Sequence, residues 1–189
     1  MLDLFSGLGG ASESFVLAGW DVTRIESNSR FFNIPHTEIN DVRFLDFDDL
    51  DYFDLIWCSP PCLEFSMAYN APKSVARRKG LEFQPNMELV LQSKKIIDYL
   101  QPEYWVIENV MGAQEFFNPI LGKPTQIINS FCLWGNFPKI LMPANYHHTK
   151  EDVGPGNPLR ANIRAKIPYE VSEQLRRSIE EQRTLRDYL

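Results

Sequence analysis

DLFSGLGG, residues 3–10, is the stretch that decides the fold. The apolar residues at its start predict a short strand over 1–5, and the helical spacing of the apolar residues after the glycines predicts a helix over 11–18. A strand that runs through glycines into a helix points backbone amides at a ligand laid across the turn. The sequence therefore predicts a cofactor-binding loop in this stretch.

Apolar runs that are typical of strands alternate with helix-like stretches along the rest of the chain. The strand candidates are residues 1–5, 21–25, 54–58, 104–107 and 127–134. Residues 88–100 have one apolar face and stop before Pro102, and a last helix is expected over about 168–188. This alternation predicts an α/β fold with a doubly wound, Rossmann-like and mostly parallel sheet. Its functional crevice should lie at the carboxyl ends of the strands.

Length and composition limit the domain organisation and the cellular setting. The 189 residues fit one compact domain over 1–189, and no apolar run approaches the length of a membrane span. Residues 1–5 lack the features of a secretory signal peptide. The 3 cysteines are expected to be free thiols in a reducing compartment, so we expect a soluble, cytoplasmic protein. The net charge of -6 argues mildly against a surface that coats nucleic acid, although a local basic face can still bind it.

The glycine pattern narrows the class of cofactor. A dinucleotide fingerprint requires G-x-G-x-x-G, but Gly7, Gly9 and Gly10 are not followed by a third glycine at the required offset. The Gly-Lys-Ser/Thr ending of a phosphate-binding P-loop is also absent from the stretch. What remains is a nucleoside cofactor without a pyrophosphate, of which S-adenosylmethionine is the commonest.

Two carboxylates fit an adenosine cofactor. Glu26 follows the second strand candidate about twenty residues after the glycine turn, where a carboxylate typically binds ribose hydroxyls. Asp41, in EINDV, is expected at the end of a third strand, where it could accept a hydrogen bond from an adenine amino group. Without the glycine loop, each would be interpreted as an ordinary exposed acid. The spacing of these two acids after the glycine loop favours a role in cofactor binding over that interpretation.

WCSPPCLEFS, residues 57–66, follows directly after the fourth strand candidate. Pro60 and Pro61 restrict the backbone and aim Cys62 into the crevice, so we interpret Cys62 as a nucleophile. A core cysteine would not need two prolines before it.

Glu108, followed by Asn109, ends an otherwise apolar strand candidate and should face the same crevice. Partial burial would raise the pKa of this carboxyl and suit it to donate a proton. Cys58 and Cys132 lie within apolar strands and are expected to be core thiols.

The motifs DLFSGLGG, SPPC with FS downstream, and ENV occur in this order, with a Glu after the second strand. In this combination the chain resembles the DNA (cytosine-5) methyltransferases over roughly residues 1–135. The resemblance implies the S-adenosylmethionine-dependent methyltransferase fold, S-adenosylmethionine as cofactor and DNA as partner. It also implies that Cys62 adds to C6 of a flipped-out cytosine while Glu108 protonates N3, with Asn109 in the catalytic set.

The resemblance assigns the remaining site residues. The implied cofactor-binding residues are Phe5, Ser6, Gly7, Leu8, Gly9, Gly10, Glu26, Asp41, Val42 and Pro60, with Asp46 as the alternative to Asp41. The implied substrate-binding residues are Pro61, Ser66, Arg77 and Arg78. Both arginines belong to a long loop, residues 67–87, that is suited to phosphates but is equally well interpreted as a solvated basic turn.

Two features depart from the family pattern. The Gln-x-Arg-x-Arg element expected at Gln126 reads QIINS, so the arginines expected near the base are missing. Only a short loop over residues 143–162 stands where typical members carry a target-recognition domain, so recognition is expected to be minimal or supplied by a specificity subunit or a homo-oligomer. The ending RAKIPYEVSEQLRRSIEEQ resembles short, phage-type members, in which a final helix packs beside the cofactor loop.

Three functional classes stay open. The first is a minimal DNA cytosine-5 methyltransferase of phage or restriction-modification type, in a bacterial or phage-infected host cell. The second is an RNA cytosine-5 methyltransferase or a partner-dependent subunit, and the third is a non-catalytic cofactor-binding module. The presence of both Cys62 and Glu108 argues against the third class. His147 and His148 do not predict a metal site, because adjacent histidines point apart and the usual ligand spacings are absent.

Overall fold

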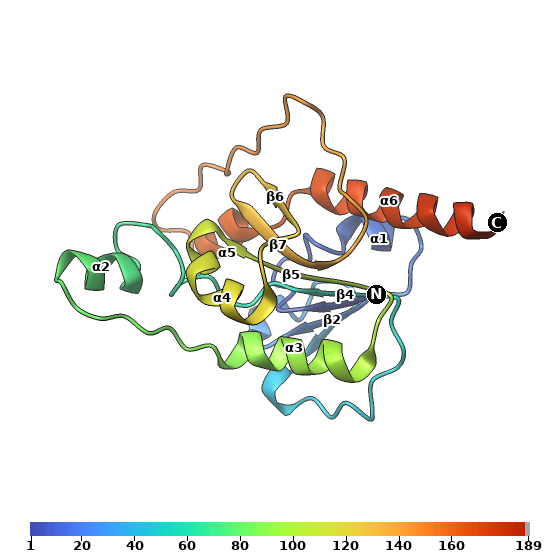
Figure 1. The fold of residues 1–189 in the computed structure, drawn as a ribbon, viewed down its shortest axis with the longest axis horizontal. Coiled ribbons are helices and arrows are strands. Elements are labelled where there is room, and N and C mark those ends of the chain that lie inside the picture. The colour runs from blue at the N-terminus through green and yellow to red at the C-terminus, as the bar shows by residue number, and fades with distance from the viewer. Residues whose placement is uncertain (188–189) are drawn as a thin grey trace.

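The computed structural model describes residues 1–187, and within them seven strands form one sheet. The strands are β1 (Leu2–Leu4), β2 (Thr23–Glu26), β3 (Thr37–Ile39), β4 (Leu55–Cys58), β5 (Tyr104–Val110), β6 (Gln126–Ile128) and β7 (Phe131–Asn136). Their order is β3-β2-β1-β4-β5-β7-β6 (Figure 1). The first five strands pair in parallel, and β7 runs antiparallel to both β5 and β6. The predicted α/β fold with a doubly wound, mostly parallel sheet is confirmed.

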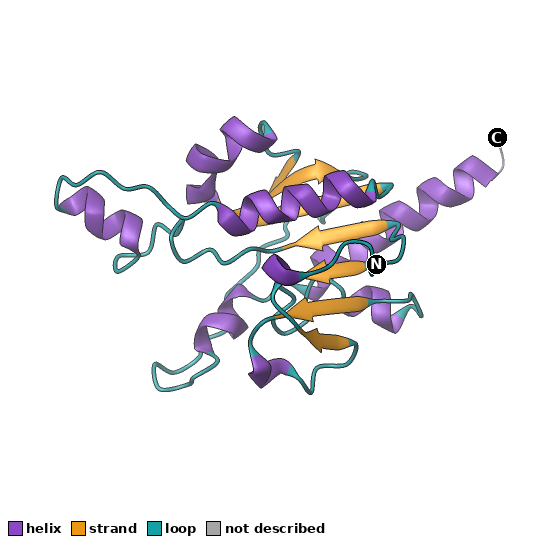
Figure 2. Ribbon diagram, turned by 90° about the horizontal axis from the view of Figure 1, so that it is seen from below, coloured by secondary structure: helices purple, strands orange, loops and turns teal. Residues whose placement is uncertain are grey.

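Helices pack on both faces of this sheet (Figure 2). They are α1 (Glu13–Leu17), α2 (Pro72–Arg78), α3 (Glu88–Leu100), α4 (Gln114–Leu121), α5 (Arg160–Ala165) and α6 (Tyr169–Asp187), with 3₁₀ turns η1 (Ser29–Phe31), η2 (Val42–Phe44) and η3 (Met111–Ala113). In residues 1–187 no helix combines the length and the apolar character that a bilayer crossing requires.

Successive side chains of the central strands point to opposite faces of the sheet, which divides the core into two layers. Leu55 and Trp57 of β4 pack with residues of α1 and α6, whereas Ile56 and Cys58 pack with residues of α3 and α4. Because both faces are covered, all four positions are buried, and the strand reads as one apolar run.

The last helix packs beside the glycine loop, as expected. Ser172 Oγ of α6 donates a hydrogen bond to the Ala11 carbonyl at 2.7 Å, and Leu175 and Ile179 are buried against the core. The helix was expected over 168–188; α6 spans Tyr169–Asp187, and Tyr188 lies outside the described residues.

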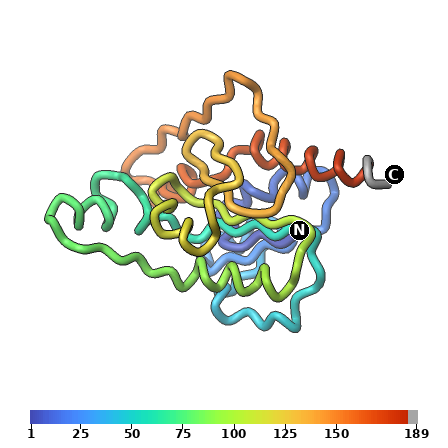
Figure 3. Tube along the Cα trace, in the orientation of Figure 1, coloured from blue at the N-terminus to red at the C-terminus, as the bar shows by residue number. Residues whose placement is uncertain are grey.

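Three boundaries differ from the sequence expectations. Residues 127–134 were predicted as one strand, but Asn129 has a left-handed φ of 53° and turns the chain between β6 and β7. β5 continues through Val110, so Glu108 lies within the strand. The segment expected to be a loop to residue 162 already contains the start of α5, where Arg160 Nε donates to the Val153 carbonyl at 2.7 Å. Figure 3 shows the path of this connection from β7 to α6 in orange.

Candidate active site

A cavity of about 430 Å³ opens where four parallel strands end. One wall consists of Phe5, Ser6, Gly7, Leu8 and Gly10 beyond β1, Glu26 and Ser27 at the end of β2, Ser59, Pro60, Pro61, Cys62 and Leu63 beyond β4, and Glu108 and Val110 of β5. The second half of the chain adds Ser130, Phe131, Lys150 and residues on or next to α5. The cavity therefore lies in the crevice that the strand alternation predicted.

Glu26 fixes the shape of the glycine loop. Its Oε2 accepts a hydrogen bond from the Gly7 amide at 2.8 Å, and its Oε1 accepts one from the Asn28 amide at 2.8 Å. Gly7 has a left-handed φ of 51°, which glycine adopts without steric cost. Phe5 also has a positive φ, 60°, and lines the cavity. The loop thus places an aromatic ring and a carboxylate at one end of the cavity.

Two side-chain oxygen atoms at this end are buried without hydrogen-bond partners. Asp3 Oδ1 and Ser6 Oγ make no hydrogen bond to any residue that the structure describes, and both residues line the cavity. Asp3 Oδ2 accepts a hydrogen bond from Ser12 Oγ at 2.5 Å, and Ser12 Oγ accepts one from Arg24 Nε at 2.8 Å. Burial raises the pKa of Asp3 to about 6, although Ser12 and Arg24 act to lower it. An unpartnered buried oxygen on a cavity wall indicates a ligand group that completes it.

Cys62 is held on the wall by the proline pair before it. Asn109 Nδ2 donates a hydrogen bond to the Pro60 carbonyl at 2.9 Å, and Asn109 Oδ1 accepts one from the Val110 amide at 2.9 Å. Asn109 is 1% exposed and does not line the cavity. Its side chain ties the Pro60–Pro61 segment to β5. The catalytic role implied by the resemblance stays a prediction.

Glu108 and Cys62 influence each other across the cavity. Burial raises the pKa of Glu108 to about 7, while a hydrogen bond with Ser59 and the charge of Lys150 act to lower it. Burial also raises the pKa of the Cys62 thiol, the negative charge of Glu108 adds to that rise, and Lys150 opposes it. The free site therefore favours a protonated thiol beside a carboxyl that titrates near neutrality.

The other two thiols are not placed for chemistry. Cys58 and Cys132 are 0% exposed and belong to the layer beneath α3 and α4. Burial raises the pKa of Cys132 to about 11 and that of Cys58 still further. Both match the core role expected from the sequence.

The structure does not bring Asp41 and Val42 to this cavity. Asp41 caps η2, where its Oδ1 accepts a hydrogen bond from the Arg43 amide at 2.9 Å and its Oδ2 accepts one from Arg43 Nη2 at 2.6 Å. Val42 is 3% exposed and packs in the core. Ser27, at the end of β2, lines the cavity.

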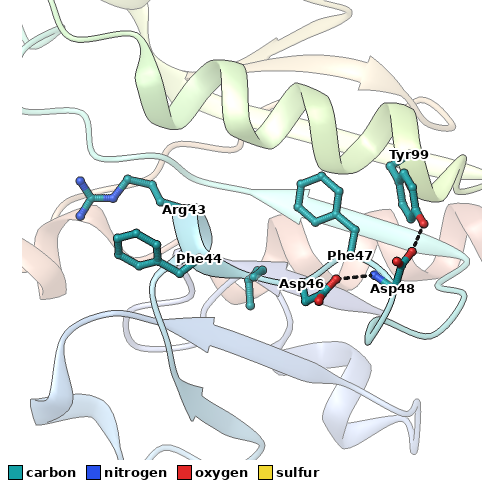
Figure 4. Close-up of a pocket in the computed structure, with 7 residues that line it drawn as sticks. Arg43, Phe44, Asp46, Phe47, Asp48 and Tyr99 are labelled. Atoms are coloured by element: carbon teal, nitrogen blue, oxygen red, sulfur yellow. Dashed lines mark hydrogen bonds between the residues drawn. The ribbon is translucent and has the colours of Figure 1, made fainter.

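A second, open hollow of about 570 Å³ lies beside η2 and α3 (Figure 4). Its lining residues are Arg43, Phe44, Leu45, Asp46, Phe47, Asp48 and Tyr99. Asp46, the alternative to Asp41, lies here, and its Oδ1 accepts a hydrogen bond from the Asp48 amide at 3.1 Å. The hollow has no thiol, and none of its lining residues has a buried polar side-chain atom without a partner. We therefore place the functional site at the Cys62 cavity.

Three other expected residues also lie off the cavity wall. A Cβ on Gly9 would lie 2.6 Å from Arg24 Cζ, so this glycine makes room for the arginine. Arg77 and Arg78 belong to α2, which projects from the body of the protein (Figure 1). The Arg78 guanidinium lies 3.8 Å from the Tyr69 ring centroid, and Arg77 is exposed.

Several residues on the wall were not anticipated from the sequence. Asp3 carried a signal, because a carboxylate inside an apolar strand is unusual. Lys150 and Arg164 come from segments far from the motifs, and only the folded chain brings them to the cavity. Ser130 belongs to the QIINS stretch that stands in place of the Gln-x-Arg-x-Arg element. Among the described residues, no group of three His, Cys, Asp or Glu side chains is placed to hold a metal ion.

Comparisons with known proteins agree with this site. "Type II methyltransferase M.DdeI" of Desulfomicrobium norvegicum is 30% identical over 124 residues, which cover 59% of this chain and 28% of that protein. The "Probable DNA (cytosine-5)-methyltransferase" of Frog virus 3 is 28% identical over 121 residues, or 58% of this chain and 52% of that protein. "Type II methyltransferase M.HgiGI" of Herpetosiphon aurantiacus is 28% identical over 124 residues, or 60% of this chain and 91% of that protein.

The aligned region of this chain spans between about a quarter and nine-tenths of these relatives, and less than two thirds of the first two. The family model for C-5 cytosine-specific DNA methylases matches residues 1–135, which contain the glycine loop, Cys62 and Glu108. The chain belongs to the C-5 cytosine-specific DNA methylase family.

Proposed function

We propose that the protein transfers a methyl group from S-adenosylmethionine to C5 of cytosine in DNA, through a covalent adduct with Cys62. The observation that carries the proposal is that Cys62 and Glu108 line one cavity together with the glycine loop. Membership of the C-5 cytosine-specific DNA methylase family supports both the reaction and the methyl donor.

The cavity residues fit S-adenosylmethionine. Asp3 Oδ1, buried and without a partner, would accept a hydrogen bond from the ammonium group of the methionine part. Glu26 would bind the ribose hydroxyls through lone pairs that the Gly7 and Asn28 amides leave free. Phe5 would pack against the adenine. The chain therefore offers a partner to each polar end of the cofactor.

The two reactive side chains activate cytosine from opposite sides of the ring. C5 is a weak nucleophile, so the Cys62 thiolate forms a bond to C6 while Glu108 gives its proton to N3, which makes C5 electron-rich. S-Adenosylmethionine supplies the methyl group that C5 receives. A base, for which water is the candidate, then takes the C5 proton. The S–C6 bond breaks, Cys62 leaves as the thiolate, and the N3 proton returns to Glu108.

The target base must leave the duplex to reach this cavity. A stacked cytosine cannot present C6 to Cys62, so the nucleotide has to be flipped out. Pro61 and Ser66 line the cavity and would contact the extruded base. Arg77 and Arg78 of the projecting α2 are suited to the phosphates on either side of it.

Recognition of the surrounding sequence is expected to be minimal. We treat residues 1–189 as one catalytic domain in which the short segment 143–162 stands in place of a recognition domain. Discrimination between bases needs side chains in a groove, and this segment supplies few. A specificity subunit or a second copy of the chain would extend the recognised sequence. The expected setting is the cytoplasm of a bacterium or of a phage-infected host cell.

Trapping with 5-fluorocytosine tests the proposal. DNA that carries this base should form an adduct with the protein in the presence of S-adenosylmethionine, because fluorine cannot leave as the C5 proton does and elimination stalls. The adduct should survive denaturing electrophoresis. Cys62→Ser should abolish it, since a hydroxyl is far less ionised than a thiol at neutral pH.

Cys58→Ser is the matched control and should still form the adduct, because this thiol is buried. Duplex DNA, single-stranded DNA and RNA substrates should be compared side by side. An adduct formed only with RNA would transfer the proposal to an RNA substrate. Cofactor binding without an adduct on any of these substrates would favour a non-catalytic module.

A further inference from the structure

Lys150 brings a free positive charge to the cavity. It lies between β7 and α5, in a stretch without helix or strand, and lines the cavity with Cys62 and Glu108. Within the part of the chain that the structure describes, no hydrogen bond or ion pair engages its ammonium group. The nearby β6–β7 hairpin contributes only the uncharged Ser130 and Phe131 to the wall.

The other two cations on the wall have partners. Lys166 Nζ forms an ion pair with Glu13 Oε2 at 2.7 Å. Arg164 Nη1 donates a hydrogen bond to the Glu151 carbonyl at 3.4 Å. Lys150 is thus the one cation on the wall whose charged group has no hydrogen-bond or ion-pair partner among the described residues.

Contacts on both sides fix the backbone at Lys150. The His148 ring packs on Phe131, with ring centroids 5.7 Å apart. On the other side, the Glu151 carbonyl is the acceptor for Arg164. Because Phe131 and Arg164 both line the cavity, these contacts hold the stretch against the cavity wall.

We propose that Lys150 is a positioning residue whose ammonium group stabilises the thiolate form of Cys62, the form that attacks the base. The inference rests on the proposed role of Cys62 as the nucleophile. A thiolate in a buried site next to a carboxylate is unfavourable unless a cation compensates it. A backbone hydrogen bond at Cys62 lowers the pKa of the thiol, and Lys150 is the cation that adds to this effect.

The charges that face the thiol act in opposite directions. After burial, the negative charge of Glu108 on β5 is the largest effect that raises the pKa of Cys62, and Lys150 is the charged group that lowers it. The remaining charged groups on the wall are Asp3, Glu26, Arg164 and Lys166. These four residues are not among the groups that shift this pKa. Removing Lys150 should therefore raise the pKa of the thiol, and removing the carboxylate of Glu108 should lower it.

Alkylation of Cys62 in the full chain, without DNA, measures this effect. Iodoacetamide reacts with the thiolate, so the rate of labelling, followed by mass spectrometry of the Cys62 peptide, reports the ionised fraction at each pH. Lys150→Met should slow labelling at about pH 7.5 by roughly three- to tenfold and move the midpoint of the pH curve upward by about half to one unit. Lys150→Arg should restore the wild-type curve, and Glu108→Gln should move the midpoint downward.

Lys139→Met is the matched control. Lys139 belongs to the same connecting stretch but does not line the cavity, so its replacement should leave the curve unchanged. Superimposable curves for Lys150→Met and wild type would overturn the inference even if the 5-fluorocytosine adduct forms. A shifted curve in a protein that makes no adduct would support the electrostatic role of Lys150 and refute the proposed methylation.

Discussion

Replacement of Glu108 by Gln tests the proposed acid through the pH dependence of adduct formation. The reaction requires Cys62 as the thiolate and Glu108 in its protonated form. Burial raises the pKa of Glu108 to about 7, and burial with the charge of Glu108 raises that of Cys62 above its ordinary value of about 8.5. As the pH rises, Glu108 therefore loses its proton before Cys62 does, whereas the reaction needs Cys62 deprotonated while Glu108 is still protonated. At any pH, therefore, only a small fraction of free molecules holds both required forms.

This order determines the shape of the pH profile. Below about pH 7, each pH unit increases the thiolate about tenfold while Glu108 stays protonated, so the rate rises. Between about pH 7 and the pKa of the thiol, the gain in thiolate is offset by loss of the acid, so the wild-type rate is level. Gln cannot give up a proton. Glu108→Gln should react roughly 10²- to 10⁴-fold more slowly near neutrality, and its rate should keep rising through pH 7.

Single-turnover adduct formation on 5-fluorocytosine DNA, measured over about pH 6 to 9.5, separates these profiles. The ratio of wild-type to variant rates should shrink about tenfold for each pH unit above 7, until the thiol itself is ionised. Cys58→Ser should reproduce the wild-type profile. If Glu108→Gln instead runs parallel to the wild type across the whole range, Glu108 is not the acid.

Two further predictions concern the cofactor end of the cavity. A Cβ at Gly10 would lie 2.5 Å from the Ile167 carbonyl, so Gly10→Ala should displace α6 from the loop and weaken cofactor binding by at least about tenfold in calorimetry. Gly154→Ala, where the new Cβ meets nothing within 4 Å, should bind normally, and equal affinities for the two variants would contradict the argument. Asp3 has a pKa of about 6 in the folded state against about 3.9 unfolded, so its ionisation lowers the free energy of unfolding as pH rises between these values. Asp3→Asn should therefore gain about 1.4 kcal/mol relative to wild type between about pH 5 and pH 7.5 in urea unfolding, yet lose cofactor affinity. If the difference in unfolding free energy between Asp3→Asn and wild type does not change with pH, the raised pKa of Asp3 is contradicted.

The sequence predicted those parts of the site that depend on local pattern. The strand, the glycine turn and the residues after β4 are each determined within a few positions, so the glycine loop, Cys62 and Glu108 were located correctly on one crevice. Asp41 follows β3 as expected, but its carboxylate caps a 3₁₀ turn through Arg43, an arrangement typical of Asp side chains in turns, and it does not line the cavity. Its contact with an adenine stays a prediction.

Long-range placement could not be predicted in the same way. Lys150 lies in a stretch without periodicity, and only its neighbours His148 and Glu151, through Phe131 and Arg164, fix it beside the cavity. The split of residues 127–134 depended on a left-handed Asn129, which single-residue propensity does not reveal. The apolar residues on both sides of this turn, Ile127, Ile128, Phe131 and Cys132, made the run look continuous.

The distribution of charge around the cavity separates binding of DNA from activation of the thiol. The chain carries a net charge of -6, and the acids Asp3 and Glu26 line the end next to the glycine loop. Phosphates are therefore expected at cationic side chains, at Arg164 on the wall and along the exposed Arg77 of α2. A phosphate paired with Lys150 would cancel the charge that lowers the pKa of Cys62. The two roles are compatible only if the backbone of the DNA is held by the arginines and Lys150 stays free to face the thiol.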